Sequence, residues 1–351
     1  MKIRAVALFS GGLDSALAVR LLQDQGVEIK ALHFYTGFCI TEHKRRLGLK
    51  REDGSLYVNP ALKAAALLQV PLEILDISEE YFNLILNPKY GYGKNVNPCL
   101  DCRIFMLKKA KEFMEKEGYA FVVTGEVLGQ RPMSQTFDRL MLIEKEAGLS
   151  GYILRPLSAK LLPQTIPEKL GWVNRDQLLD IWGRSRKKQL KLAKEYGLEH
   201  EQPAGGCCYL TDENYAHRFR EVIRVEGSIA REDLVLLAVG RHFRLPSGAR
   251  LILARNEGEV RFLQGFRHRY DYACRKDGKG TFGLLKGRLS EEEFNLVAGL
   301  VARYSKNQPC EVLLSIGGRE TVVWADTLSE ELADSIKIYK RKGDKHGSGK
   351  S

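Results

Sequence analysis

The chain has 351 residues, of which 44% are hydrophobic and 28% charged, and these shares exclude a disordered or collagen-like protein. The formal net charge of +11 favours a polyanionic partner, and the length favours two or three domains. No apolar run approaches the roughly 20 residues that span a bilayer, and the first residues lead into a strand without a signal-peptide pattern. We therefore expect a cytoplasmic protein with no membrane partner.

The first part of the chain alternates between strand and helix patterns. Strands are predicted at residues 3–10, 27–35, 71–77 and 120–124, and helices at 13–21, 61–68 and 100–116. This alternation predicts an α/β fold with a doubly wound parallel sheet covered by helices on both faces. In such sheets, ligands bind at the carboxyl ends of the strands.

The pattern changes in the later part of the chain. Residues 176–196 are predicted to form a strongly basic helix. Beyond about residue 224, β-rich runs at 234–239, 250–254 and 312–316 and a helix at 291–304 predict a smaller α+β domain. The expected divisions are therefore a first domain at 1–224, a second at 225–340 and a disordered basic tail at 341–351.

A glycine-rich segment follows the first predicted strand and precedes the first predicted helix. Gly11 and Gly12 let backbone N–H groups approach phosphate oxygens, and the helix N-terminus adds the positive end of its dipole. Ser10 and Ser15 can donate hydroxyl hydrogen bonds, and Asp14 can hold a Mg²⁺ ion that neutralises phosphate charge. The alternative is a simple glycine turn with a serine or aspartate helix cap. The spacing differs from that of a Walker A loop.

Residues 10–15 read Ser-Gly-Gly-Leu-Asp-Ser, which resembles the PP-loop (SGGxDS) of the ATP pyrophosphatases. The resemblance implies a fold of the adenine nucleotide alpha hydrolase type and cleavage of ATP to AMP and pyrophosphate by adenylation of a substrate oxygen. It implies that the loop residues bind ATP, and we add His33, Thr124 and Gly125 to the expected ATP-binding residues.

Seven cysteines form an odd set, which argues against a disulfide framework in an intracellular chain. Cys99 and Cys102 form a CxxC pair whose sulfurs can face one metal ion, and Cys207 and Cys208 follow a Gly-Gly pair that could bring a third sulfur to the same place. A structural zinc half-site, a catalytic iron–sulfur centre and a persulfide relay all remain open. The other cysteines are expected to be inert fillers: Cys39, Cys274 and Cys310.

The order of these motifs resembles the tRNA 2-thiouridylases and the cluster-dependent tRNA thiolation enzymes. The shared motifs are the loop at 10–15, Asn97-Pro98-Cys99-Leu100-Asp101-Cys102, Thr124-Gly125 and Gly206-Cys207. The resemblance implies a [4Fe-4S] cluster held by Cys99, Cys102 and Cys207, or a persulfide on Cys207. The choice of Cys207 over Cys208 rests on matching the Gly-Gly-Cys string, and Glu126-Val127 stands where the 2-thiouridylases have His-Tyr.

A second resemblance lies downstream, at residues 239–245 and 254–257, which are similar to the RNA-binding NFACT-R-like module. Residues 241–288 carry 12 Lys and Arg against 4 Asp and Glu, with aromatic residues interleaved. Such a composition favours phosphate contact and base stacking, although a solvated charged face over core aromatics is the alternative. The expected RNA-binding residues are Arg241, His242, Arg244, Arg255, Lys187 and Lys188.

Together these features predict a tRNA sulfurtransferase (thiouridine synthetase) that activates a uridine carbonyl oxygen with ATP and replaces it by sulfur. Its expected partners are tRNA and a sulfur donor, which would be sulfide, a sulfur-carrier protein or a cysteine desulfurase. We count a homodimer among the expected oligomeric states. The alternatives are a PP-loop ligase or amidotransferase with another substrate, and a non-catalytic RNA-binding protein.

Overall fold

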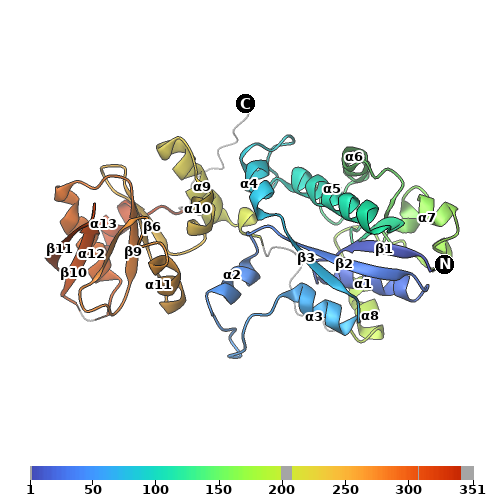
Figure 1. Cartoon of the computed structure of the whole chain (residues 1–351), viewed down its shortest axis with the longest axis horizontal. Helices are drawn as coiled ribbons and strands as arrows, with labels where there is room; N and C mark the ends of the chain where they lie inside the picture. The colour runs from blue at the N-terminus through green and yellow to red at the C-terminus, as the bar shows by residue number, and fades with distance from the viewer. Residues whose placement is uncertain (1, 199–207, 307, 341–351) are drawn as a thin grey trace. The chain divides into compact units, whose positions relative to one another are not determined.

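The computed structural model describes residues 2–198, 208–306 and 308–340 (Figure 1). The chain forms two compact units, one from Met1–Glu42 and Val58–Cys208 and the other from His43–Tyr57 and Tyr209–Ser351. The units thus divide at residues 208 and 209, whereas we predicted a division near residue 224. The predicted tail at 341–351 lies outside the described residues. Within the described ranges, no helix combines the length and the apolar character needed to cross a membrane.

The first unit is built from alternating strands and helices, as its sequence predicts. Its strands are β1 (Arg4–Leu8), β2 (Glu28–Tyr35), β3 (Leu72–Asp76), β4 (Phe121–Thr124) and β5 (Ile153–Leu154). Its helices are α1 (Leu13–Gln23), α3 (Pro60–Leu67), α4 (Ser78–Leu86), α5 (Cys99–Glu117), α6 (Phe137–Ala147), α7 (Ile166–Lys169) and α8 (Lys187–Glu195), while α2 (Ile40–Arg46) leads into the segment at 43–57. The strands pair in parallel in the order β3-β2-β1-β4-β5.

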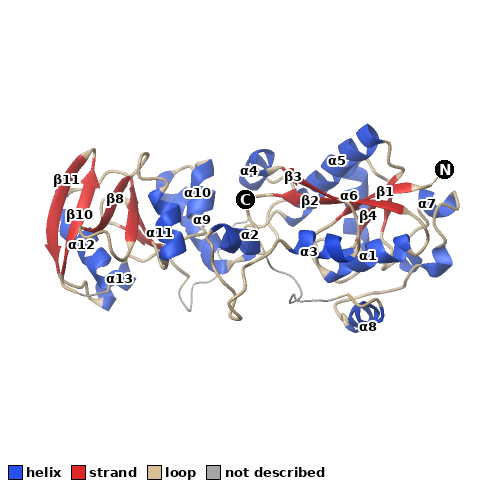
Figure 2. Ribbon diagram, turned by 60° about the horizontal axis from the view of Figure 1, so that its bottom comes forward, coloured by secondary structure: helices blue, strands red, loops and turns tan. Residues whose placement is uncertain are grey.

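Each face of this sheet is covered by helices because alternate side chains of every strand point to opposite faces. On β1, Ala5 and Ala7 pack in one core with α1 and α3. Val6 and Leu8 pack in the other core, with α5 and α6. Figure 2 shows α5 on one side of the sheet and α1 and α3 on the other.

The strand order places a crevice at the end of β1. From β1 the chain winds outward to β2 and β3 on one side, and then crosses to β4 and β5 on the other. Loops that leave the carboxyl ends of β1 and β4 therefore lead to opposite faces, and ligands bind at this point of such sheets. The glycine-rich loop at 10–15 and Thr124-Gly125 both lie at these ends.

The second unit is an antiparallel sheet with helices on both faces. Its strands are β6 (Arg241–Arg244), β7 (Arg250–Leu253), β8 (Asp271–Arg275), β9 (Phe282–Lys286), β10 (Cys310–Ile316) and β11 (Arg319–Ala325), in the order β11-β10-β8-β9-β7-β6. Its helices are α9 (Glu213–Glu226), α10 (Arg231–Leu236), α11 (Glu257–Gln264), α12 (Phe294–Arg303) and α13 (Glu330–Ser335). One core contains α12 and the other contains α10 and α11, which confirms the predicted α+β class.

Two predicted elements were wrong. The run at 234–239, predicted as β-rich, begins inside α10, because Asp233 caps that helix by accepting a hydrogen bond from Ala230 N at 3.0 Å. The helix predicted over 176–196 is limited to α8. Its first half is irregular because Ile181 N and Gly183 N donate to the carbonyls of Leu157 and Leu128 instead of to a helical ladder.

Candidate active site

The loop between β1 and α1 is shaped by close backbone contacts. Gly11 has a φ of +75°, and a Cβ there would lie 2.3 Å from the Pro60 carbonyl carbon, so only glycine fits. Ser10 Oγ accepts from Gly12 N at 3.3 Å, and Ser15 Oγ donates to Gly12 O at 2.8 Å. The loop is therefore held open at the helix N-terminus, where backbone N–H groups favour anions.

Asp14 lies in the first turn of α1 with one carboxylate oxygen unused. Its Oδ2 accepts a hydrogen bond from Gln130 Nε2 at 3.2 Å. Its Oδ1 is buried and has no hydrogen-bond partner among the described residues. A buried carboxylate oxygen that only accepts is suited to a hard cation, so the residues fit the Mg²⁺ ion expected with a nucleotide.

The end of β4 packs directly against this loop. A Cβ on Gly125 would lie 2.5 Å from both the Asp14 carbonyl carbon and the Ser15 amide nitrogen. Thr124 is buried, and its hydroxyl donates to Glu126 Oε2 at 3.1 Å. The two predicted motifs, the loop and Thr124-Gly125, therefore meet at one place in the structure.

We expect Gly125→Ala to lower the apparent affinity for ATP strongly, because the added methyl group must displace the backbone of the loop. A displacement of about 1 Å at such a site can cost roughly a hundredfold in rate. Isothermal titration with ATP would measure the loss. Gly299→Ala is the matched control, since a Cβ there makes ordinary contacts of 3.4 Å or more. Unchanged ATP binding by Gly125→Ala would contradict this packing.

His33 lies on β2 beside the same loop. Its Nδ1 donates to the carbonyl of Phe9 at 3.0 Å. Burial lowers the pKa of His33, and the Phe9 carbonyl and Glu42 oppose that change only in part. The imidazole is therefore neutral near pH 7, and its role in ATP binding stays a prediction.

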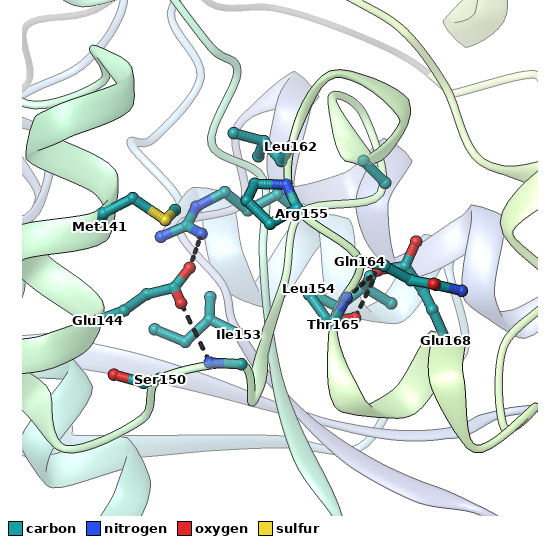
Figure 3. A pocket seen from close by; sticks show the side chains of 13 residues that line it. Met141, Glu144, Ser150, Ile153, Leu154, Arg155, Leu162, Gln164, Thr165 and Glu168 are labelled. Carbon is teal, nitrogen blue, oxygen red and sulfur yellow. Dashed lines mark hydrogen bonds and ion pairs between the residues drawn. The ribbon is translucent and has the colours of Figure 1, made fainter.

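A buried ion-pair network extends from β4 to the helix that carries Cys99 and Cys102. Glu126 Oε1 lies 3.1 Å from Arg103 Nε, and Glu126 Oε2 lies 3.0 Å from Arg155 Nε. Burial alone would raise the pKa of Glu126, but the two arginines and Thr124 outweigh it and hold the pKa below its ordinary value. Arg155 also pairs with Glu144 (Figure 3). Arg103 is the residue that follows Cys102, so the network links the ATP loop to the cysteines.

Figure 3 shows Arg155 in the wall of a cavity of about 280 Å³ between α6, β5 and α7. Polar groups in the wall form hydrogen bonds with one another: Arg155 donates to Glu144, and Thr165 donates to Glu168. None of the sequence-predicted site residues that the structure describes lines this cavity. The candidate site is therefore the crevice at β1 and β4.

Cys99 is the first residue of α5, and Cys102 lies one turn further on. The Tyr81 hydroxyl donates to the Cys102 thiol, and burial raises the pKa of that thiol while Tyr81 and Arg103 oppose the rise. Burial also raises the pKa of the Tyr81 phenol, and Cys102, Cys208 and Cys99 raise it further through their charges. The Tyr81 hydroxyl thus contacts Cys102, and the charges of Cys99 and Cys208 also act on it.

The third predicted thiol, Cys207, lies outside the described residues, and so does its Gly-Gly pair. Its neighbour Cys208 is described, and its backbone pairs with that of Cys39. Cys39, which we expected to be an isolated filler, is thus adjacent to the cysteine region. Cys274 and Cys310 lie on β8 and β10 of the second unit. Within the described part of the chain, no three His, Cys, Asp or Glu side chains are arranged to hold a metal ion.

Sequence reasoning missed several polar residues at the site, above all Arg131. Its guanidinium makes no hydrogen bond or ion pair with the described residues, and it lies in the loop that also carries Gln130. Desolvation and Arg103 lower the pKa of Arg131, whereas Asp14, Glu126 and Cys99 raise it. Charges from the ATP loop and from the CxxC pair thus both act on this arginine. The sequence feature that could have identified Gln130 and Arg131 as site residues is that they follow Thr124-Gly125 closely along the chain.

The residues predicted to bind RNA in the second unit are largely engaged within it. Arg244 pairs with Glu221 and Glu226 at 2.7 and 2.9 Å, and Arg255 pairs with Glu259 at 2.5 Å. Arg241 lies 4.4 Å from the centroid of the Tyr304 ring. His242 is 1% exposed, burial lowers its pKa well below the ordinary value, and its Nε2 donates to Val239 O. The His242 ring therefore presents no surface to a ligand in this structure.

The 12-to-4 excess of basic residues at 241–288 overestimates the charge available to RNA. Acids from outside that stretch pair with it, so much of the excess is neutralised within the unit. The pairs are Arg250 and Lys286 with Asp233, Arg269 with Glu232, and Lys276 with Glu311. On α8 of the first unit, by contrast, Lys187 is exposed and Lys188 makes only a surface pair with Asp180.

Comparison with protein families finds two separate matching segments. Residues 1–160 match the family described as "Thiamine biosynthesis protein (ThiI)". Residues 240–332 match the family described as "NFACT protein RNA binding domain".

Similar proteins act on tRNA according to their names. A tRNA-specific 2-thiouridylase MnmA of Geotalea uraniireducens (strain Rf4) is 25% identical over 62% of this chain and 57% of the relative. A probable tRNA sulfurtransferase of Thermococcus kodakarensis is 29% identical over 44% of this chain and 36% of the relative. A solved 4-thiouridine synthetase in complex with RNA and ATP is 21% identical, with a TM-score of 0.37 over 56% of this chain and 41% of that chain.

The chain spans little more than half, or less, of the length of these relatives. The loop at 10–15 and the CxxC pair fall inside the matched segment 1–160, and the downstream sheet falls inside the matched segment 240–332. The chain is thus similar to the ThiI family over residues 1–160 and to the NFACT RNA-binding domain over residues 240–332, and the relatives named above are a tRNA thiouridylase and a probable tRNA sulfurtransferase.

Proposed function

We propose that this chain is an ATP-dependent sulfurtransferase that replaces a uridine carbonyl oxygen of tRNA by sulfur. The observation that carries the proposal is an ion pair that links the end of β4, beside the ATP loop, to the helix that begins with the CxxC pair. This Glu126–Arg103 pair joins the residue after Gly125 to the residue after Cys102. The charges of Asp14 and Cys99 both raise the pKa of Arg131.

The first proposed step activates the uridine. Its carbonyl oxygen attacks the α-phosphorus of ATP, the bond to the bridging oxygen breaks, and pyrophosphate leaves. The backbone N–H groups at Gly11 and Gly12 hold phosphate oxygens at the N-terminus of α1. Asp14 Oδ1 would hold Mg²⁺, and Arg131 supplies positive charge toward the departing pyrophosphate.

The second proposed step delivers sulfur. A sulfur nucleophile attacks the activated carbon, the bond from that carbon to the adenylate oxygen breaks, and AMP leaves with the former uridine oxygen. Cys99 and Cys102 supply two thiols beside the activated uridine, and Tyr81 orients the second of them. We propose Cys207 as the third cysteine. A [4Fe-4S] cluster, if bound by the three thiolates, would supply an iron position to carry sulfide, and a Cys207 persulfide is the alternative carrier.

The proposed partners follow from the same chemistry. The target is tRNA, held in part by the NFACT-R domain, and the sulfur comes from sulfide, a carrier protein or a cysteine desulfurase. We also propose that the first unit carries catalysis and the second unit this RNA contact. A homodimer remains a proposal about the assembly.

The fate of the uridine oxygen tests this mechanism. We expect heavy oxygen placed at the target carbonyl of tRNA to appear in AMP, in a ratio of about one per sulfur incorporated, because the adenylate leaves with that oxygen. Mass spectrometry of the released AMP measures the transfer. Heavy oxygen that stays in the RNA while AMP forms would contradict the mechanism and favour a ligase or amidotransferase with another substrate.

Cysteine variants test the sulfur carrier. After anaerobic reconstitution we expect iron and acid-labile sulfide in the full chain, and their loss in Cys99→Ala, Cys102→Ala and Cys207→Ala. Cys310→Ala is the control, since that thiol lies in the second unit. Cys208→Ala decides between the neighbouring thiols. Stoichiometric zinc without iron would overturn the cluster, and full activity without any metal would favour the persulfide.

A further inference from the structure

Trp182 is a largely exposed aromatic side chain that lies next to the ATP loop. Its exposed fraction is 70%, although indole is among the largest apolar side chains. The surrounding backbone is held firmly, because Trp182 forms a parallel bridge with Leu128 and Gly183 N donates to Leu128 O at 2.8 Å. The exposed ring is therefore displayed from a fixed backbone.

Gly129 lets the ring lie against the chain. It has a φ of +76°, and a Cβ there would lie 2.8 Å from Trp182 Nε1. One side of the indole thus rests on the Gly129 backbone. The next residue, Gln130, donates to Asp14 at 3.2 Å. A planar group stacked on the open side of Trp182 would therefore lie close to the site of uridine activation.

Positive charge continues from Trp182 along α8. Between residues 182 and 196 the chain has six basic side chains and one acidic one. Arg184, Lys187 and Lys194 are exposed and have no acidic partner among the residues that the structure describes. Helix α8 turns its buried residues, Gln189 and Ala193, toward the unit, which leaves the lysines outward. This charge contrasts with the paired arginines of the second unit.

We propose that Trp182 and these basic residues form a surface that binds a single-stranded segment of RNA next to the target uridine. The inference rests on the proposed function, because that RNA is the proposed substrate. We call it the tryptophan surface: Trp182, Arg184, Lys187, Lys188, Lys191 and Lys194. Exposed aromatic rings stack on any base, and neighbouring cations contact the phosphates, which is the usual combination in single-strand binding.

The extent of the surface favours RNA over the adenine of ATP. Helix α8 has nine residues and is therefore about 14 Å long, and because the ATP phosphates are already assigned to the loop at 10–15, its charges are left for a second polyanion. A polynucleotide presents a phosphate at every nucleotide and can follow the helix. One base of that strand would stack on Trp182 while its neighbour reaches the crevice.

Binding of unmodified tRNA to the full chain tests the proposal. We expect Trp182→Ala to weaken binding about tenfold and Trp182→Phe to retain most of the affinity, because a smaller ring still stacks. Lys187→Ala should lower the log–log salt slope by about 0.7, as expected for one contact to a single strand. Leu170→Ala is the control, since Leu170 is a 58% exposed apolar residue of the same unit.

ATP binding by the same variants separates the alternatives. We expect it to be unchanged in Trp182→Ala. Wild-type tRNA affinity in Trp182→Ala would overturn the proposal. If that variant also lost affinity for ATP, the ring would be assigned to adenine instead. Neither measurement requires thiolation. If tRNA binding depended on Trp182 but the chain transferred no sulfur, the proposed function would be refuted and the tryptophan surface would stand.

Discussion

Replacing Asp14 by Asn is expected to reduce tRNA-dependent pyrophosphate release by at least about a hundredfold, because the variant lacks the charge that would hold Mg²⁺ on the phosphates. The amide keeps the size of the side chain. Asp14 Oδ1 has no hydrogen bond to lose among the described residues, so the fold should be unaffected. Pyrophosphate release measured with a coupled assay, next to thermal unfolding, would separate the two effects.

Asp24→Asn is the matched control for Asp14. Asp24 lies at the other end of α1, where it pairs with Arg20 at 2.9 Å on the surface. Its replacement should leave pyrophosphate release unchanged. Wild-type activity in Asp14→Asn would show that the loop at 10–15 does not serve the reaction.

The second large effect is expected at Glu126, which is 2% exposed and lies between Arg103 and Arg155. Glu126→Gln keeps the shape but leaves two guanidinium groups near each other without their shared counter-charge. Removing one partner of such a buried network costs roughly 3–5 kcal/mol in the free energy of unfolding. Urea unfolding of the full chain would measure this loss.

The pH dependence gives Glu126 a second signature. Its pKa in the folded chain is lowered, so its stabilisation is complete above the ordinary value of 4.5 and is lost as the pH falls through the folded value. The difference between wild type and Glu126→Gln should therefore be constant above about pH 5 and shrink below it. Glu146→Gln, which breaks a surface pair with Lys89, should have little effect at any pH. Equal stability of Glu126→Gln and wild type would contradict the network.

Periodicity and motif spacing predicted the first unit well because its features are local. The ATP loop is defined within residues 4–23 by a buried strand, a glycine turn and the first turn of a helix. The parallel topology of the sheet then brings Thr124-Gly125 to this loop. The role of Glu126 could not be predicted, since its partners Arg103 and Arg155 are more than 20 residues away on each side.

The charge analysis of the second unit failed for a similar physical reason. Counting charges along 241–288 ignores acids that come from other elements, and Glu221, Glu226 and Asp233 of α9 and α10 pair with that stretch. His242 looked like a polar contact, but helices cover both faces of this sheet, and His242 is buried on β6 as its neighbour Phe243 is. The exposed Trp182 was missed because the predicted helix at 176–196 would have continued through it.

The central claim is that cleavage of ATP to AMP and pyrophosphate, through adenylation of the uridine oxygen, drives sulfur into a uridine of tRNA, and nucleoside mass spectrometry tests it most directly. The full chain would be incubated with unmodified tRNA, Mg²⁺, ATP and a sulfide source, and the tRNA then digested to nucleosides. We predict a thiouridine that forms only with ATP and is lost in Asp14→Asn. ATP conversion to AMP and pyrophosphate with no sulfur in the tRNA, or thiouridine that forms without ATP, would contradict the claim.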